Sequence, residues 1–419
     1  MDKFTEKCTK LKIILSVGLA LVFFVIGLAF FARPKISESE KRTLTKFPKL
    51  TVESFLSGEY TAEISLWYSD TYPLRESMVN ANFKFKDLYG IKGEQLLLMG
   101  GGAAGEGGDT VGGYYVKDNT AYELCTATKS SSDKYISAIN TAYSLLKGKA
   151  NVYNIVVPLH YAVSLSAEDI SIIQQSLNLA NNKEIIDYIY SNLNSGIKTV
   201  DAYSALKSHS NEYIYFRTDH HWTARGAYYA YEKFCKIKGI SPTPLSRYEK
   251  LEFGGFLGTL YEKTQRPVAL ESAKDTIEAF VPIGTNDMTV HEKDGTITNQ
   301  YEIVCTYTDR MYQSAGSKYN CFIAGDNPLT EIHNKAKNDG SSVLIVKESY
   351  GNAFVPFLVD SYEYVYVIDY RYWKGTFSSF IDEKDIDDVI FLNVLNATLD
   401  SKDPEIDNDR VDTFDRFIK

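Results

Sequence analysis

The stretch FRTDHHWTARGAYYAYEKF, residues 216–234, places Asp219, His220, His221 and Trp222 side by side in a chain that has only six histidines. An aspartate next to two histidines can bind a metal ion, or it can supply the acid/base part of a catalytic triad. A polar turn without chemistry is the third interpretation. Two observations distinguish these three interpretations. One is the kind of element that holds the residues, and the other is whether the sequence contains a nucleophile elsewhere.

A helix is predicted directly after this group, with Thr223 as its N-cap and Gly239 near its end. Its apolar residues recur at helical spacing, at Ala224, Ala227, Tyr228, Tyr231, Phe234 and Cys235. In an extended loop, side chains two residues apart face the same way, so Asp219 and His221 should face together and His220 away. A carboxylate so placed fixes the tautomer of the histidine and stabilises its imidazolium form.

A candidate nucleophile lies in SVLIVKESYGNAFVPFL, where a strand over 342–347 runs into Ser349 and an apolar helical segment. At such a turn the hydroxyl of Ser349 is exposed, and the amide of Tyr350 and the side chain of Asn352 are candidate oxyanion donors. The segment departs from the G-x-S-x-G pattern, and Pro356 predicts an irregular first turn. A serine after a strand is also an ordinary helix cap. With Asp219 and His221, however, Ser349 would complete a triad.

From residue 151 onward, short β-branched runs alternate with helical periods, which predicts an α/β sheet with crossover helices. The strand candidates are residues 151–158, 197–202, 320–325, 342–347, 363–369 and 387–394. Residues 246–318 read as an antiparallel β insertion with a hairpin turn at KDGT. The glycine-rich run 99–113 predicts a flexible loop without a phosphate-binding frame.

Residues 13–32 form an uninterrupted run of uncharged, mostly apolar residues, which predicts a transmembrane helix rather than a cleaved signal peptide. The lysines that precede it, Lys3, Lys7, Lys10 and Lys12, favour a cytoplasmic N-terminus and an extracytoplasmic main domain. The predicted order is a cytoplasmic tail (1–12), the anchor (13–32), a linker and helical lead-in (33–120), the α/β domain (121–400) and a polar tail (401–419).

Composition narrows the class of function. The formal net charge of −9 argues against a nucleic-acid partner. The 31 tyrosines suit a sugar-contacting groove and equally suit half-buried strands. Trp222, Tyr370, Arg371 and Trp373 are the candidate groove residues. The cysteines form no CxxC pair that would indicate zinc or redox chemistry, and no disulfide is predicted among Cys125, Cys235, Cys305 and Cys321.

The blocks TDHHWTARGAYYAY, CFIAGDNPLTEI, VLIVKESYGNAFVPFLVDSYEYVYVIDYRYW and DDVIFLNVLNAT together resemble the DHHW protein family, which is related to alginate O-acetylation proteins with an SGNH-hydrolase-like domain. The resemblance covers most of residues 45–400. It implies that Asp219 orients, His221 is the base and Ser349 the nucleophile, with no cofactor. It also implies an acetyl group delivered by a membrane-bound O-acyltransferase partner and passed to a cell-surface polysaccharide.

The sequence therefore predicts a membrane-anchored, extracytoplasmic serine O-acyltransferase with a mostly parallel, SGNH-like sheet and a β insertion. If water replaces the sugar acceptor, the same site is a carbohydrate esterase. A non-catalytic glycan-binding scaffold of an export complex is the alternative from another class. A metal site of Asp219, His220 and His221 would need further ligands, for which Asp326 and His160 are candidates.

Overall fold

The computed structural model of the chain describes residues 113–400, apart from 176, 265–267 and 312, together with 410–419. In the N-terminal part it describes residues 17, 18, 21, 33, 36, 37, 42, 43, 46–56, 59–73 and 95–98. The chain divides into two compact units, one of Met1–Lys92 with Gln265–Val268 and one of Gly93–Thr264 with Ala269–Lys419. All the site residues discussed below belong to the second unit.

The first unit contains the short strands β1 (Ile36–Ser37) and β2 (Arg42–Thr43) and the helices α2 (Val52–Leu56) and α3 (Glu59–Asp70). Trp67 of α3 packs edge-on against Phe47, and the guanidinium of Arg33 lies 4.0 Å from the Trp67 ring centroid. Both helices lie within residues 33–120, where the sequence predicts a linker and a helical lead-in. None of the described helices has the length and apolar character needed to cross a bilayer. The predicted anchor at 13–32 and glycine-rich loop fall almost wholly outside the described residues.

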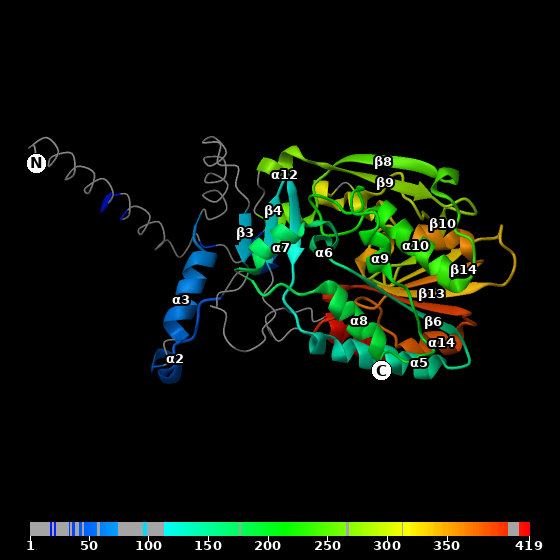
Figure 1. Ribbon diagram of the computed structural model, residues 1–419, viewed down its shortest axis with the longest axis horizontal. Helices are drawn as coiled ribbons and strands as arrows, with labels where there is room; N and C mark the ends of the chain where they lie inside the picture. The colour runs from blue at the N-terminus through cyan, green and yellow to red at the C-terminus, as the bar shows by residue number, and fades with distance from the viewer. Residues whose placement is uncertain are drawn as a thin grey trace, which may run out of the picture. The chain divides into compact units, whose positions relative to one another are not determined.

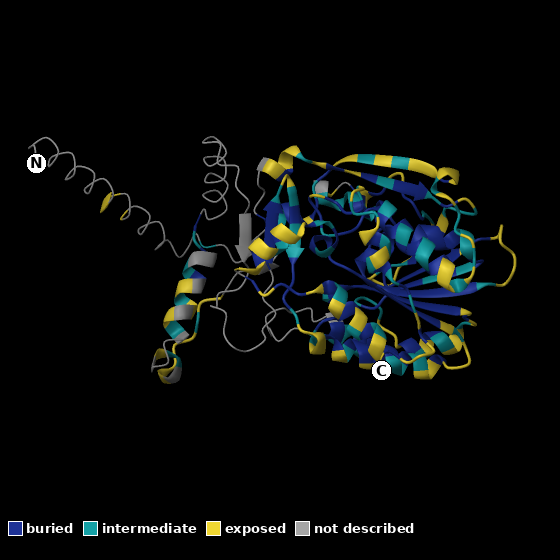
Figure 2. Cartoon of the chain, in the orientation of Figure 1, coloured by how far each residue is buried: buried dark blue, intermediate teal, exposed yellow. Residues whose placement is uncertain are grey.

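The second unit is built on an eight-stranded sheet with the order β11-β10-β12-β14-β13-β15-β6-β7 (Figure 1). Strands β14, β13, β15, β6 and β7 are parallel, and β12, β10 and β11 extend one edge in antiparallel pairing. The strands are β6 (Asn151–Val157), β7 (Lys198–Thr199), β10 (Asp287–His291), β11 (Ile297–Glu302), β12 (Leu329–His333), β13 (Ser342–Lys347), β14 (Tyr364–Asp369) and β15 (Asp388–Val394). Every residue of β13 and β15 is buried, as expected for parallel strands covered on both faces (Figure 2).

Helices cover both faces of this sheet, with α5, α8, α14 and α15 on one side and α9 and α10 on the other (Figure 1). The α-helices of the second unit are α5 (Asp133–Leu146), α6 (His160–Ser164), α7 (Ala167–Gln174), α8 (Asn182–Asn192), α9 (Ala202–Lys207), α10 (Ala224–Lys238), α11 (Thr259–Lys263), α12 (Val268–Ser272), α13 (Val355–Leu358), α14 (Phe377–Glu383) and α15 (Arg410–Ile418). Short 3₁₀ helices connect them: η2 (Lys129–Ser132), η3 (Leu245–Arg247), η4 (Asp309–Met311), η5 (Ala315–Cys321), η6 (Ser349–Ala353), η7 (Val359–Ser361) and η8 (Leu395–Thr398). A three-stranded antiparallel sheet of β3 (Gln95–Leu98), β4 (Gly113–Lys117) and β5 (Thr120–Leu124) precedes them.

Five of the six predicted strands are present, and the one at 320–325 is wrong. Residues Ile323, Ala324 and Gly325 have φ angles of 46°, 54° and 85°, in the left-handed region, whereas a strand needs negative φ. The strand of this block begins later, as β12. The left-handed run is strained because Ile323 is β-branched, and such strain is concentrated near functional sites.

The antiparallel insertion predicted at 246–318 divides into two parts. Strands β8 (Glu249–Phe256) and β9 (Asp275–Val281) form a separate ribbon, with α11 and α12 between them. Strands β10 and β11 form a hairpin whose turn is at the predicted KDGT, and they pair with the main sheet through β12. Only the first part is therefore separate from the sheet.

The polar tail predicted at 401–419 is wrong for its last residues, because α15 buries Val411, Phe414, Phe417 and Ile418. The Phe414 ring packs on Tyr135 of α5 and on Tyr370, with centroids 5.3 and 5.2 Å away. The apolar residues three and four positions apart are the helical signal in this otherwise charged segment.

Replacing Phe414 by alanine should reduce the free energy of unfolding by about 3–5 kcal/mol, since it removes a fully buried aromatic ring. Urea denaturation followed by circular dichroism measures this change. As a control, Ile172→Ala on α7, where the side chain is exposed, should change the value by less than about 0.5 kcal/mol. Equal effects of the two substitutions would mean that α15 does not dock on the domain.

His160 makes the second unit sensitive to acid. Its ring lies between those of Tyr122 and Tyr215, and its Nδ1 has no hydrogen-bond partner among the described residues. Burial lowers the pKa of His160 to about 3. Because the unfolded chain binds the proton with a pKa of about 6.5, stability is complete above that pH and falls progressively as the pH drops toward 3.

Between pH 7.5 and pH 5, this single group should reduce the free energy of unfolding by about 2 kcal/mol. The variant His160→Phe keeps an aromatic ring between the two tyrosines but cannot bind a proton. Urea denaturation of both proteins at the two pH values should show a smaller acid loss in the variant. An identical loss in both would exclude His160 as its source.

Candidate active site

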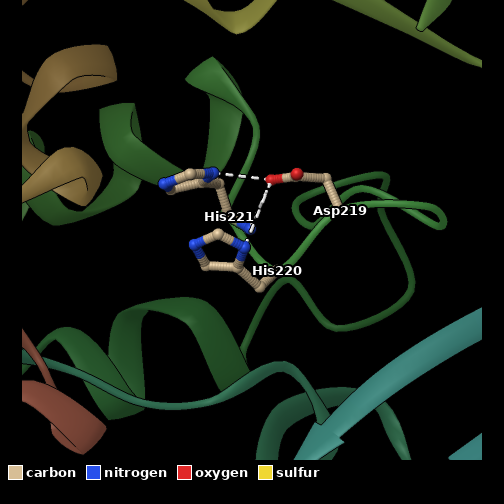
Figure 3. A group of neighbouring side chains, drawn as sticks. All are labelled: Asp219, His220 and His221. Atoms are coloured by element: carbon tan, nitrogen blue, oxygen red, sulfur yellow. Dashed lines mark hydrogen bonds and ion pairs between the residues drawn. The ribbon is translucent and has the colours of Figure 1, made fainter. Parts of the chain in front are cut away.

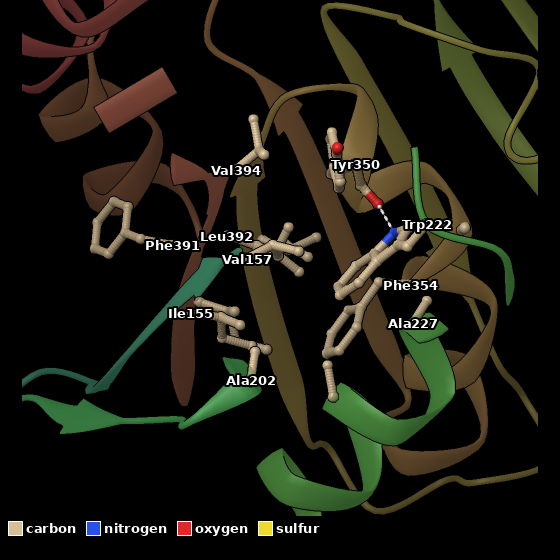
Figure 4. Packing of buried hydrophobic residues seen from close by; sticks show 14 of the residues in the cluster. Ile155, Val157, Ala202, Trp222, Ala227, Tyr350, Phe354, Phe391, Leu392 and Val394 are labelled. Carbon is tan, nitrogen blue, oxygen red and sulfur yellow. Dashed lines mark hydrogen bonds between the residues drawn. The ribbon is translucent and has the colours of Figure 1, made fainter. Parts of the chain in front are cut away.

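The loop that carries the predicted histidines is fastened at its end by Trp222, which is fully buried. The indole Nε1 of Trp222 donates to the backbone oxygen of Tyr350 at 2.9 Å (Figure 4). Thr223 then caps α10, because its hydroxyl accepts from the amide of Gly226. Trp222 is thus a structural anchor between two distant segments, and its predicted contact with a substrate groove is wrong.

The structure brings the three predicted triad residues together. His221 Nδ1 lies 2.6 Å from Asp219 Oδ1, and His221 Nε2 lies 2.7 Å from Ser349 Oγ, although His221 and Ser349 are 128 residues apart. A carboxylate accepts only, so Nδ1 carries the ring proton and Nε2 accepts from the serine hydroxyl. The three side chains therefore have the hydrogen-bond arrangement that a general base, its orienting carboxylate and a serine nucleophile require.

Hydrogen bonds fix both carboxylate oxygens of Asp219. Its Oδ1 also accepts from the amide of His221 at 3.0 Å, and its Oδ2 accepts from the amide and the hydroxyl of Thr259 at 2.8 and 3.1 Å. Burial alone would raise the pKa of Asp219, but the neighbouring His221 and His220 and these hydrogen bonds outweigh it and hold the pKa far below its usual range. The Asp219 carboxylate is therefore ionised at neutral pH.

A glycine makes this approach possible, because a Cβ at Gly258 would lie 2.2 Å from the Cβ of Asp219. Any side chain at this position would push the ribbon that carries Thr259 away from the carboxylate.

His220 does not face away from its neighbours, so the prediction from extended-loop alternation is wrong. Residues 217–221 form consecutive bends, and the His220 ring centroid lies 3.9 Å from that of His221. Its Nδ1 lies 2.6 Å from Thr259 Oγ1. The same nitrogen lies 3.9 Å from Asp219 Oδ1 (Figure 3). With 15% of its side chain exposed, His220 lies on the solvent side of this group.

Ser349 opens η6 one residue after β13, and the buried Glu348 between them fixes this turn. Ser349 is 8% exposed, so the prediction of an exposed hydroxyl is wrong. Glu348 Oε1 accepts from the amide of Val394 at 2.9 Å, and Oε2 accepts from the amide of Tyr350 at 3.1 Å and lies 3.3 Å from Ser349 Oγ. The predicted role of the Tyr350 amide as an oxyanion donor is therefore wrong here, since that N–H is engaged by a carboxylate.

Four charged side chains form a compact cluster beside the serine, at the carboxyl ends of β13 and β14. Arg371 lies 2.9 Å from Asp326 and 2.7 Å from Asp369, and Lys347 lies 3.2 Å from Asp369. Burial would raise the pKa of Asp326, but the adjacent Arg371 and Lys347 hold it well below its usual range. In this cluster each of the two basic side chains lies within ion-pair distance of both acidic ones, and Asp326 and Arg371 keep 25% and 17% of their side chains exposed.

Asn352 is fixed by this cluster, because its Nδ2 donates to Asp326 at 3.0 Å and its Oδ1 accepts from Lys347 at 2.6 Å. Of the predicted groove residues, Arg371 lies at the site. Tyr370 is 2% exposed and packs on Phe414 in the core, so its predicted substrate contact is wrong. Trp373 packs edge-on against Phe380 of α14.

Sequence reasoning missed Thr259, Tyr319 and Glu348. The Tyr319 ring stacks on His221 with centroids 4.1 Å apart, and its hydroxyl donates to the Ser349 carbonyl at 3.3 Å. No local pattern distinguishes Thr259 or Tyr319, since both reach the site from distant segments. The one available signal for Glu348 is its position before the predicted nucleophile.

Comparison with known proteins places this geometry in context. A family model described as DHHW protein matches residues 40–100 and 94–368. The crystal structure of a DHHW family protein from Eubacterium siraeum is 31% identical, with a TM-score of 0.59, over 69% of this chain and 92% of that one. Bacillus cereus PatB1, solved with a sulfonyl adduct, is 17% identical with a TM-score of 0.55 over 70% and 96% of the two chains. No curated protein matches.

The O-acetyltransferase domain of Pseudomonas putida AlgJ is 11% identical, with a TM-score of 0.38, over 73% of this chain and 99% of that domain. PatB1, at 17% identity and a TM-score of 0.55, shares the fold of the second unit.

The variant Asp219→Asn tests the orienting role of this carboxylate. An amide at this position can stabilise the other imidazole tautomer, which would slow attack by Ser349 by about 10³- to 10⁴-fold. The rate at which a sulfonyl fluoride labels Ser349, followed by intact-mass spectrometry, measures this effect. Thr259→Val, which keeps the amide bond to Asp219 and loses the hydroxyl bond, should slow labelling by about tenfold.

Both variants should keep the circular dichroism spectrum of the parent protein. Labelling of Asp219→Asn at the parental rate would show that Ser349 does not depend on this carboxylate.

Proposed function

Since the chain belongs to the DHHW protein family, we propose that it is a serine O-acyltransferase that transfers acetyl groups to a cell-surface polysaccharide. The observation that carries the proposal is the position of the His221 ring, 2.6 Å from Asp219 and 2.7 Å from Ser349. The mixed α/β fold with its mostly parallel sheet supports it, because the nucleophile lies at the carboxyl end of a buried parallel strand.

In the first half of the reaction, His221 Nε2 takes the hydroxyl proton as Ser349 Oγ bonds to the acyl carbon of the donor ester. The bond from that carbon to the donor oxygen then breaks, and the departing oxygen takes the proton back from His221. The products are an acyl ester of Ser349 and the donor alcohol. Asp219 stabilises the imidazolium between the two steps.

In the second half, a sugar hydroxyl gives its proton to His221 Nε2 and attacks the acyl carbon, and Ser349 regains the proton as its ester bond breaks. Both tetrahedral intermediates carry an oxyanion that needs hydrogen-bond donors. The bond to Asp326 uses one of the two hydrogens on Asn352 Nδ2, and the proposal assigns the other to this oxyanion.

Limited exposure supports transfer rather than hydrolysis. Ser349 is 8% exposed and His221 6%, so a sugar bound over Ser349 would cover the little surface through which water could reach the ester. Carbohydrate esterase activity is the alternative, in which water takes the place of the sugar hydroxyl.

We also propose that residues 13–32 span the membrane and that the second unit lies on the extracytoplasmic side. In that setting a membrane-bound O-acyltransferase partner would supply the acetyl group. Neither the anchor nor the partner is needed for the chemistry at Ser349, so the two parts can be tested separately.

Incubation of the full chain with 4-nitrophenyl acetate should give one acetyl adduct, mapped to Ser349 by intact-mass and peptide mass spectrometry. The adduct should be absent from Ser349→Ala and His221→Ala. Ser361→Ala is the matched control, because Ser361 bonds to Tyr231 outside the triad, and it should be acetylated like the parent.

Adding a neutral oligosaccharide should then discharge the adduct with acetyl transfer to the sugar, whereas release of acetate alone indicates an esterase. If the parent protein gains no adduct, or Ser349→Ala gains the same one, the triad does not form an acyl-enzyme. The non-catalytic glycan-binding scaffold would then become the leading alternative.

A further inference from the structure

Asp219, His220 and His221 each offer one ligand atom within 4.8 Å of those of the other two. Figure 3 shows both imidazole rings on the side of the Asp219 carboxylate. Asp219 Oδ1 lies 2.6 Å from His221 Nδ1 and 3.9 Å from His220 Nδ1. The triad needs only the first of these contacts, so the second imidazole is a feature that the proposed reaction does not use.

Two imidazole nitrogens and one carboxylate oxygen are a ligand set that suits Zn²⁺ and similar transition-metal dications. Calcium and magnesium prefer oxygen ligands alone. Zinc sites with three protein ligands leave a fourth position for water. Bonds of about 2.0–2.1 Å in tetrahedral geometry place ligand atoms about 3.3 Å apart. On metal binding, the 2.6 Å distance from Asp219 Oδ1 to His221 Nδ1 must therefore lengthen slightly. The 3.9 Å distance from Asp219 Oδ1 to His220 Nδ1 must shorten slightly.

An ion can reach this position from the solvent side. The His220 side chain is 15% exposed, whereas those of Asp219 and His221 are 3% and 8% exposed. To bind the ion, His220 Nδ1 must exchange its contact with Thr259 Oγ1 for the metal.

We propose that Asp219, His220 and His221 bind a zinc-like dication and that this ion switches off Ser349. A neutral imidazole carries one ring proton, so a metal bond at His221 Nδ1 leaves that proton on Nε2. The change of tautomer passes through solvent exchange and changes no charge on the ring. Nε2 then donates toward Ser349 Oγ instead of accepting from it, and His221 is no longer a base for the nucleophile.

The inhibitory half of this inference rests on the proposed function, but the binding half does not. Zinc binding is therefore measured first on full-length Ser349→Ala, which lacks the nucleophile and keeps all three ligands. Isothermal titration calorimetry with ZnCl₂ should detect a site that is weakened by the added change His220→Gln. Even loss of an outer partner weakens metal sites about 10- to 100-fold, so loss of a ligand should cost at least about tenfold.

Two further variants make this titration specific. His220→Cys supplies another zinc ligand and should keep the site if His220→Gln loses it. His333→Gln is the matched control, because His333 pairs with Glu363 at the far end of β12 and β14 from the triad. It should leave the zinc titration unchanged, and MgCl₂ should give no site in any variant. Zinc affinity that is equal with and without His220 overturns the proposal.

The second measurement is the rate at which a sulfonyl fluoride labels Ser349 in the parent protein. Zinc should slow this labelling, a chelator should restore it, and His220→Gln should raise the half-inhibitory zinc concentration at least about tenfold. Zinc that binds through His220 without slowing the labelling overturns the inhibitory half and leaves a metal site. If no acetyl-enzyme forms, the proposed function is contradicted, but the metal site is not. The zinc titration alone then decides whether the metal site exists.

Discussion

The hydrogen bond from the Trp222 indole to the Tyr350 carbonyl joins the two segments on which the whole site depends. The first segment is the loop of Asp219, His220 and His221, which leads into α10. The second is the turn that carries Ser349. Both groups are buried, so breaking this bond would leave a donor and an acceptor without water as well as without each other. The bulk of the indole fills the space between α10 and η6, where it stacks on Phe354 with centroids 6.4 Å apart. The distance from His221 to Ser349 therefore follows from core packing and not from the flexibility of a surface loop.

The buried charged side chains next to Ser349 are stabilised by ion pairs. Lys347 and Asp369 have no exposed surface, and their cost of burial is offset because each lies within ion-pair distance of the other. Arg371 and Asp326 close the cluster on the solvent side. Glu348 accepts two backbone N–H groups, which anchor the turn that carries Ser349 to β15. These ion pairs and backbone hydrogen bonds keep the fixed charges near Ser349 in place.

The sequence was sufficient for features whose signal is local. The parallel strands read directly as buried β-branched runs, and the order aspartate, histidine, serine on a loop and a strand end predicted the triad. It was insufficient where distant segments meet. Nothing near Thr259 reveals that its amide and hydroxyl bind Asp219, because 40 residues of ribbon and helix separate them. Alternation along an extended loop put His220 on the wrong side because consecutive bends replaced the extended backbone. The left-handed run at Ile323 and Ala324 looks like a strand in its letters, and only the backbone shows otherwise. The aromatic residues that follow a strand predicted a substrate groove. Tyr370 instead lies in the core, because its ring is more stable packed on α15 than exposed to water.

The position of the triad along the chain has a consequence for its synthesis. Asp219 and His221 leave the ribosome early, Thr259 follows, and Ser349 arrives only after most of the sheet has been made. The last strand, β15, supplies the Val394 amide that holds Glu348, and α15 covers that face only when residues 410–418 are complete. Contacts of such long sequence separation form late in folding. In a nascent chain the turn that carries Ser349 therefore lacks its anchor until β15 has been made, because Glu348 accepts from the Val394 amide.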